Sequence, residues 1–242
     1  MEAQKDLRLA VLIDADNVPP GSLKSIMEEV ARYGNPTFKR IYGDWTKPQL
    51  SSWKKILVEN AITPIQQYEY TTGKNSTDSA LIIDAMDILY SGRADGFCIV
   101  SSDSDFTRLA VRLREAGMKV IGIGEKKTPS SFRVACEKFI YIEIINSSES
   151  KKQDMTAEKI SKPPKKELIS SLTNTINDLA DEEGWAYLGD VGNLILKKQP
   201  DFDPRNYGYQ KLTMLIKNLS VFEIDERRLD NSNVKHIFIR NK

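Results

Sequence analysis

Two short apolar runs in this chain each lead into a cluster of carboxylates. Residues 9–13 run into Asp14 and Asp16, and residues 97–100 run through two serines into Asp103 and Asp105. A short apolar run bounded by polar residues is typical of a strand buried on both faces of a parallel sheet. Open α/β sheets keep their active sites at the carboxyl ends of such strands. The two runs therefore predict an acid-lined cleft at one edge of a sheet.

Apolar runs alternate with helix-like segments from residue 7 to residue 145. Strands are expected at residues 9–13, 38–42, 62–67, 97–100, 118–123 and 139–144, and helices at residues 20–33, 51–60, 76–90, 105–116 and 129–135. This alternation predicts a doubly wound, mainly parallel sheet of the α/β class. The winding direction of such a sheet reverses between the first and fourth strands, so their carboxyl ends are neighbours. Asp14 and Asp103 are therefore expected to converge.

A different pattern follows a polar segment. Residues 147–166 are rich in Ser, Lys and Glu and contain two consecutive prolines, which predicts a flexible linker. Beyond it, helices are expected at residues 168–183, 188–198 and 209–219, and short strands at residues 221–224 and 234–240. Helices followed by a terminal hairpin predict a small winged helix-turn-helix. The expected organisation is an α/β domain at 1–146, a linker at 147–166 and a second domain at 167–242.

A third carboxylate, that of Asp78, is expected to face the same cleft. It lies in the first turn of the predicted helix 76–90, and helices that follow strands in such a fold begin on the carboxyl side of the sheet. Carboxylate pairs at ~4 Å repel by on the order of 4 kcal/mol at an effective dielectric of ~20, so the cluster favours a bound cation. The chain has one histidine, His236, and two cysteines in apolar contexts. Oxygen ligands without His or Cys predict Mg²⁺ or Mn²⁺.

A divalent ion at this cleft would activate water to attack a phosphodiester, which is nuclease chemistry without histidine. Asn17 is expected to orient a water or a carboxylate, and Ser101 and Ser102 can hydrogen-bond a phosphate or the acids. Several acids also have structural interpretations. Asp105 can cap the helix that follows it, and Asp16 can be a turn residue. Asp84 is expected to be structural because it lies six residues past Asp78 and points away from that face.

Three motifs resemble the NYN domain, the LabA-like branch of the PIN-like ribonuclease superfamily. They are Leu12-Ile-Asp-Ala-Asp-Asn17, the segment from Lys74 to Asp84 with Asp78 inside it, and Val100-Ser-Ser-Asp-Ser-Asp-Phe106. The resemblance covers roughly residues 7–145. It implies a metal-dependent endoribonuclease fold with catalytic and metal-binding positions at Asp14, Asp78, Asp103 and Asp105, supported by Asn17. A helical acid that many PIN domains have before the Asp78 position has no clear counterpart here, which leaves one or two metal ions open.

Residues 201–219 resemble the LOTUS (OST-HTH) winged helix, most specifically at the Tyr207-Gly208 pair before a helix. This resemblance implies binding of RNA, including structured RNA, and of protein partners. Basic residues around the cleft and on the second domain are expected to contact RNA phosphates. They are Lys74, Arg108, Arg112, Lys126, Lys127, Arg133, Lys211 and Lys217.

The bulk properties limit the function classes. With 35 basic and 34 acidic residues, the net charge is +1, so any RNA must bind through local basic patches. No apolar run reaches 18 residues and the N-terminus is polar, which predicts a cytoplasmic protein that does not enter a membrane. Two alternatives to a ribonuclease stay open. One is a non-catalytic RNA-binding scaffold, and the other is a haloacid-dehalogenase-type phosphatase, since Asp14 and Asp16 have the Asp-x-Asp spacing of that class.

Overall fold

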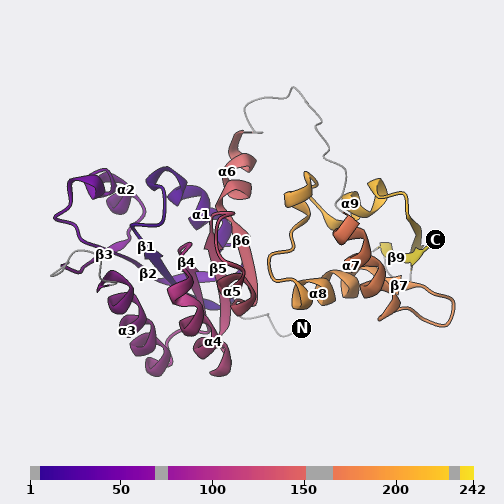
Figure 1. Cartoon of the computed structure of the whole chain (residues 1–242), viewed down its shortest axis with the longest axis horizontal. Helices are drawn as coiled ribbons and strands as arrows, with labels where there is room; N and C mark the ends of the chain where they lie inside the picture. The colour runs from indigo at the N-terminus through magenta and orange to yellow at the C-terminus, as the bar shows by residue number, and fades with distance from the viewer. Residues whose placement is uncertain (1–5, 69–75, 151–165, 229–234) are drawn as a thin grey trace. The chain divides into compact units, whose positions relative to one another are not determined.

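This computed structural model describes residues 6–68, 76–150, 166–228 and 235–242. The chain divides into two compact units, Met1–Met155 and Thr156–Lys242 (Figure 1). The last helix of the first unit, α6 (Ile142–Ser150), continues four residues into the predicted linker 147–166. Most of that predicted linker lies outside the described residues. No helix in the described ranges is long and apolar enough to cross a membrane.

The first unit contains a six-stranded sheet in which all neighbouring strands run parallel. Its strands are β1 (Arg8–Asp14), β2 (Asn35–Gly43), β3 (Thr63–Gln66), β4 (Gly96–Val100), β5 (Lys119–Gly124) and β6 (Lys138–Tyr141). Their order is β3-β2-β1-β4-β5-β6. The doubly wound α/β fold is thus confirmed, with β1 and β4 side by side at the reversal of winding. In register, Ile13 of β1 pairs with Val100 of β4.

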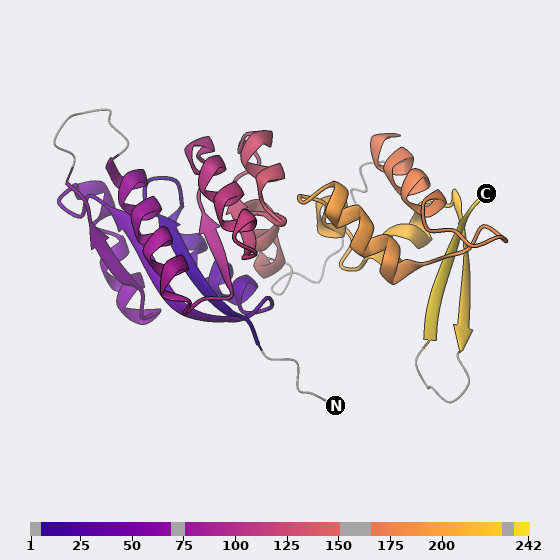
Figure 2. The ribbon, with the colours of Figure 1, turned by 90° about the horizontal axis from the view of Figure 1, so that it is seen from below.

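Helices cover both faces of this sheet (Figures 1 and 2). One face packs against α1 (Leu23–Val30), α2 (Trp53–Glu59) and α6. The other packs against α3 (Ser76–Ser91), α4 (Thr107–Glu115) and α5 (Ser130–Ala135). Short 3-10 turns, η1 (Pro20–Ser22), η2 (Pro48–Leu50) and η3 (Ser104–Phe106), precede α1, α2 and α4.

Strand β1 is apolar throughout because it feeds both cores. Leu9, Val11 and Ile13 pack on the α1 side, whereas Ala10 and Leu12 pack on the α3 side. All five side chains are fully buried. Alternate side chains of a strand point to opposite faces, so a continuous apolar run is the pattern that a central strand between two helix layers requires. Each large aliphatic side chain buried in this way contributes roughly 1.5–3 kcal/mol.

The predicted strand 139–144 is wrong beyond Tyr141, because α6 begins at Ile142. The β-branched residues there suggested a strand, but Ile142 and Ile145 lie three apart and both bury against the α1 side of the sheet. The Asn146 side chain also donates a hydrogen bond of 3.0 Å to the Ser22 hydroxyl. Tertiary packing on one face therefore overrides the local β propensity.

The second unit has three helices and a small antiparallel sheet. It contains α7 (Lys166–Asn177), β7 (Ala186–Tyr187), α8 (Leu188–Lys198), the 3-10 turn η4 (Pro204–Tyr207), α9 (Leu212–Asn218), β8 (Phe222–Arg228) and β9 (Lys235–Asn241). The strand order is β7-β9-β8. Figure 2 shows β8 and β9 side by side, and together they form a two-stranded ribbon. This arrangement of helices and a terminal hairpin is the predicted winged helix-turn-helix.

Two helix boundaries in this unit differ from expectation, and β7 was not expected. Helix α7 ends at Asn177 rather than at 183, because Asp181 accepts backbone hydrogen bonds from Glu183 and Trp185 and so closes a turn. Gly184, with φ of +84°, completes this turn. Helix α9 starts at Leu212 rather than at 209.

Candidate functional site

Three carboxylates meet at the carboxyl edge of the parallel sheet. Asp103 and Asp105 follow β4, and Asp78 lies in the first turn of α3. Carboxylate oxygens of these three residues all lie within 4.8 Å of one another. We call this group the acidic trio. Its members come from two segments far apart in the sequence, and the parallel topology brings the segments together.

Asp103 has a local structural task besides its place in the trio. Its backbone is extended, with φ of −86° and ψ of 134°, and its side chain accepts a 2.9 Å hydrogen bond from the Asp105 backbone N–H. Asp103 therefore caps η3. The alternative in which Asp105 caps the helix after it is not favoured, since the residue preceding α4 is Phe106. Asp105 instead leaves its own carboxylate exposed within the trio.

Asp14 is adjacent to the trio without being a member of it. Its carboxylate is buried, with 1% exposure, at the end of β1. It accepts hydrogen bonds from the Asn17 side chain at 2.7 Å, the Ser101 hydroxyl at 2.9 Å and the Asp16 backbone N–H at 3.1 Å. Burial raises the pKa of Asp14, and these three hydrogen bonds to the charged form oppose that rise. Asn17 is thus placed where the sequence predicted, against a carboxylate.

Asp78 experiences the combined field of the cluster. Partial burial, and then the negative charges of Asp14, Asp103, Asp105 and Asp16, raise the pKa of Asp78 to about 6. The side chain is therefore close enough to all four acids to interact with their charges. Such a concentration of negative charge attracts a cation. The donors are carboxylates alone, which fits a hard divalent ion such as Mg²⁺ or Mn²⁺.

Ser101 joins the two strand ends at this edge. The fully buried hydroxyl donates to Asp14 and accepts from the Asp103 backbone N–H at 3.1 Å. The sequence predicted that Ser101 could hydrogen-bond either a phosphate or the acids, and in the structure it hydrogen-bonds to Asp14 and Asp103. Ser102 accepts a 2.9 Å hydrogen bond from the Glu125 backbone N–H, which ties the loop after β5 to the same edge.

The predicted phosphate contacts on the first unit lie in varied environments. Lys74 falls outside the described residues. Arg108 is exposed on α4, and Arg112, one turn further, donates to the Tyr90 hydroxyl at 3.3 Å. Lys126 is exposed after β5.

Lys211 is exposed directly before α9. The three remaining predicted basic residues have protein partners. Lys127 pairs with Glu125 at 2.5 Å, and Arg133 donates to the Tyr141 hydroxyl at 2.7 Å. In the second unit, Lys217 pairs with Glu226 at 2.9 Å. Contact of these three side chains with phosphate would compete with contacts inside the protein.

Asp84 contacts β2 rather than the trio. Its carboxylate accepts hydrogen bonds from the Arg40 guanidinium and the buried Tyr42 hydroxyl. Burial and the bond to Asp84 raise the pKa of Tyr42, so the hydroxyl keeps its proton as a donor. These contacts fasten the helix that carries Asp78 to the sheet, in agreement with the structural role expected for Asp84.

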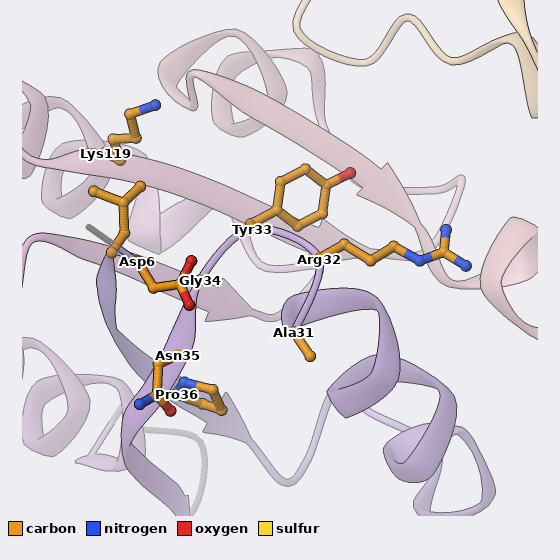
Figure 3. A pocket seen from close by; sticks show the side chains of 9 residues that line it. Asp6, Ala31, Arg32, Tyr33, Gly34, Asn35, Pro36 and Lys119 are labelled. Carbon is orange, nitrogen blue, oxygen red and sulfur yellow. The ribbon is translucent and has the colours of Figure 1, made fainter. Parts of the chain in front are cut away.

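A separate hollow of about 560 Å³ lies at the opposite edge of the sheet, near the amino ends of β1, β2 and β5. Its lining includes Arg32, Tyr33 and Lys119, and none of the predicted site residues lines it. In Figure 3 the Arg32 and Lys119 side chains extend in different directions. Because its lining lies at the amino ends of the strands, this hollow is remote from the acidic edge.

Comparisons with protein families match both units. Residues 8–143 match the NYN domain, a PIN-like nuclease family, and residues 159–234 match the OST-HTH/LOTUS domain, which binds RNA. No curated protein matches the chain.

The solved structures that are similar to the chain include three bacterial proteins. A protein of unknown function from Vibrio parahaemolyticus is 18% identical, with a TM-score of 0.49, and the match covers 59% of this chain and 96% of that one. An uncharacterized protein from Nitrosomonas europaea is 39% identical, with a TM-score of 0.28, over 30% of this chain and 70% of that one. A protein from Chromobacterium violaceum is 36% identical, with a TM-score of 0.26, over 31% of this chain and 78% of that one.

The family match spans more than half of the chain and coincides with the six-stranded parallel sheet and its acidic edge. The second match falls on the unit that has the winged helix-turn-helix arrangement. From its sequence pattern, its fold and these matches, this chain belongs to the NYN domain family and carries an OST-HTH/LOTUS domain after the NYN domain.

Proposed function

We propose that this protein is a metal-dependent endoribonuclease that hydrolyses RNA phosphodiesters at the acidic trio, with RNA bound also by the C-terminal unit. The observation that carries the proposal is the convergence of Asp78, Asp103 and Asp105 within 4.8 Å at the carboxyl edge of the sheet. The buried Asp14 carboxylate adds negative charge to the same edge. In an NYN domain this edge is the expected place for nuclease chemistry.

The acidic trio would hold Mg²⁺ or Mn²⁺, with Asp14 beside it as a further carboxylate. An ion of this class supplies a bound water of lowered pKa and stabilises charge on the leaving oxygen of a phosphodiester.

The chain's own residues fix the geometry of this edge. Asn17 and Ser101 hold the Asp14 carboxylate in one orientation. The cap of η3 fixes Asp103, and the contacts of Asp84 with β2 fix the helix that presents Asp78. Preorganised acids need no rearrangement at the moment of reaction, which is how such sites gain rate.

The backbone of a bound RNA needs positive charge near the trio. Arg108 is exposed on α4, the helix that begins two residues after Asp105. We place the scissile strand across this helix start, with Arg108 on a flanking phosphate. Neutralisation of phosphates by arginine and lysine makes affinity fall as salt rises.

The test measures cleavage of an internally labelled single-stranded RNA by the full chain with Mn²⁺, Mg²⁺ or EDTA. Asp78→Asn and Asp103→Asn are expected to lower the cleavage rate at least about a hundredfold, since metal-site ligands and their partners contribute on that scale. Asp87→Asn is the matched control, because Asp87 is an exposed acid on the same helix as Asp78. It should cleave at the wild-type rate.

Two outcomes would replace this proposal. If the wild-type chain binds RNA and cleaves none with any divalent ion, the protein is a non-catalytic RNA-binding scaffold. If Asp14 forms an aspartyl phosphate, it is a phosphatase. The structure disfavours the second outcome, because a nucleophilic carboxylate has to be open to substrate, and Asp14 is buried with hydrogen bonds to both oxygens.

A further inference from the structure

The sheet of the C-terminal unit has one face toward the helices and one face away from them. Cross-strand pairing puts side chains of paired residues on the same face. Ala186 pairs with Ile239 and Ile224 pairs with Ile239, and these side chains belong to the core of the unit. Tyr187 pairs with Phe238, so both lie on the opposite face, since successive side chains alternate.

Aromatic rings gather on this outer face. The Tyr187 ring lies 5.7 Å from the Phe238 ring and 5.6 Å from the His236 ring, measured between centroids. Trp185 lies two residues before Tyr187, so the alternation of side chains puts it on the same face as Tyr187. Tyr187 is 38% exposed, and the other three rings are partly exposed. We call these four residues the aromatic face.

Two arginines stack on the aromatic face. The Arg227 guanidinium lies 4.3 Å from the centroid of the Phe238 ring and 5.3 Å from that of the Trp185 ring. The Arg240 guanidinium lies 4.7 Å from the Trp185 centroid. The guanidinium groups thus make cation–π contacts with the Trp185 and Phe238 rings, and the Tyr187 ring lies beside Phe238 at a tilt of 51°.

The charges of this surface are balanced within it. Arg227 pairs with Asp225 at 2.8 Å, and Arg240 pairs with Glu223. The surface is therefore not a phosphate-binding patch. It fits flat aromatic groups without net charge. Aliphatic side chains of a protein would bind poorly there, because charged guanidinium groups lie over the rings. Nucleobases of single-stranded RNA have this chemistry, and arginine planes and aromatic rings are the groups on which they stack.

The exposed pair Arg228 and Lys235 lies on the other face of the ribbon, because side chains alternate along each strand and the neighbouring pair of Arg227 and His236 shares the aromatic face. Lys235 binds Glu226 there at 3.0 Å. Binding at the aromatic face therefore rests on stacking. The Tyr187 ring is backed by Gly189, where a Cβ would approach the ring to 2.6 Å. The absence of a Cβ at Gly189 therefore allows the Tyr187 ring to pack against the backbone of α8.

We propose that the aromatic face of the C-terminal unit binds unpaired bases of single-stranded RNA by stacking. This inference rests on the proposed RNA-binding role of that unit, and it names the surface and the single-stranded form of the ligand. The sequence signal is the spacing of aromatic residues by two, at 185 and 187 and again at 236 and 238.

The experiment measures binding of a fluorescein-labelled oligoadenylate of about twelve nucleotides to the full chain in EDTA, by fluorescence anisotropy. Tyr187→Leu and Phe238→Leu remove a ring and keep apolar bulk, and each is expected to weaken binding roughly tenfold. Tyr187→Phe and Phe238→Tyr keep the ring and should bind within about twofold of wild type. Thermal unfolding of each variant checks that the unit is folded.

Three further arms separate stacking from other modes of binding. The ratio between Tyr187→Leu and wild-type affinities should stay constant as salt rises, because stacking releases no counterions. Oligoadenylate should quench Trp185 fluorescence, and Trp185→Phe should lose that part of the quenching. A duplex of the same length should compete poorly because its bases are already stacked and paired.

The proposal is overturned if the ring-removing variants bind single-stranded RNA as tightly as wild type, or if duplex competes as well as single strands. It is also overturned if Tyr187→Leu instead abolishes self-association of the chain, seen by sedimentation, since a second copy would then cover the face. Lys211→Ala removes an exposed charge before α9, outside the aromatic face, and should weaken oligoadenylate binding less than the ring-removing variants do. Failure of the nuclease proposal is distinct, because it would remove RNA cleavage and leave these binding results unchanged.

Discussion

The Ser101 hydroxyl donates a 2.9 Å hydrogen bond to the Asp14 carboxylate and so links the ends of β4 and β1. The same hydroxyl accepts from the Asp103 backbone N–H. One buried serine therefore sets the orientation of an acid from the first strand and the course of the chain into the acidic trio.

Ser101→Ala is expected to lower metal-dependent cleavage by about ten- to a hundredfold, with a smaller change in KM, because partners of metal-site groups act on that scale. It should also cost about 1–3 kcal/mol of stability, since the buried Asp14 carboxylate loses a donor. Kinetics with Mn²⁺ and urea unfolding measure the two effects. Ser102→Ala removes only the bond from Glu125 and should leave more activity.

Asp78→Asn is expected to stabilise the metal-free protein at neutral pH. The folded pKa of Asp78, about 6, is above the unfolded value of 3.8, so ionisation of this carboxyl favours the unfolded state. The destabilisation is complete above pH 6 and disappears as pH falls toward 4. Because the side chain is only partly buried, solvent screening limits the expected gain to about 1 kcal/mol at pH 7.5.

Thermal unfolding in EDTA at several pH values measures this difference. Mn²⁺ should reverse the ranking, because the wild-type chain has the full acidic trio and gains more from binding than the variant. Asp87→Asn is the control on the same helix. A variant that is less stable than wild type at pH 7.5 in EDTA would contradict the charge repulsion inferred at this edge.

Asp84→Asn is expected to destabilise the first unit by about 1–3 kcal/mol, because Arg40 and Tyr42 lose a charged acceptor that is largely shielded from solvent. Tyr42→Phe should cost about 1 kcal/mol. The two residues share one hydrogen bond, so the double variant should lose less than the sum of the single losses. Urea unfolding of the four proteins in this cycle tests that coupling, and strict additivity would exclude it.

Gly122→Ala is expected to cost about 1–3 kcal/mol. Its Cβ would approach a Phe139 ring carbon to 2.6 Å and the Cys136 sulfur to 2.7 Å, in a fully packed part of the core. Gly21→Ala is the matched control, since nothing lies within 4 Å of its Cβ position. The urea midpoint of Gly122→Ala should be lower than that of Gly21→Ala. Equal midpoints would show that the core around Cys136 can rearrange to accept the extra methyl group.

Most of the first unit could be predicted from local pattern. Continuous apolar runs such as residues 9–13 identified strands covered on both faces, and the alternation with helices set the strand order. The predicted strand 139–144 runs three residues too far, because a run of β-branched residues has the same local signal in a strand as in a buried helix. Strand β7 (Ala186–Tyr187) was missed because two residues are too few to show a period.

Apolar periodicity is enough to predict that β1 and β4 end side by side with acids at their carboxyl ends, since a parallel topology leaves few other arrangements. The separate roles of those acids follow from their packing in three dimensions. Asp103 caps η3, Asp105 joins Asp78 and Asp103, and Asp14 lies buried against Ser101. These roles depend on burial and on distances of a few ångströms between side chains from different segments, and the spacing of residues along a chain does not specify such distances.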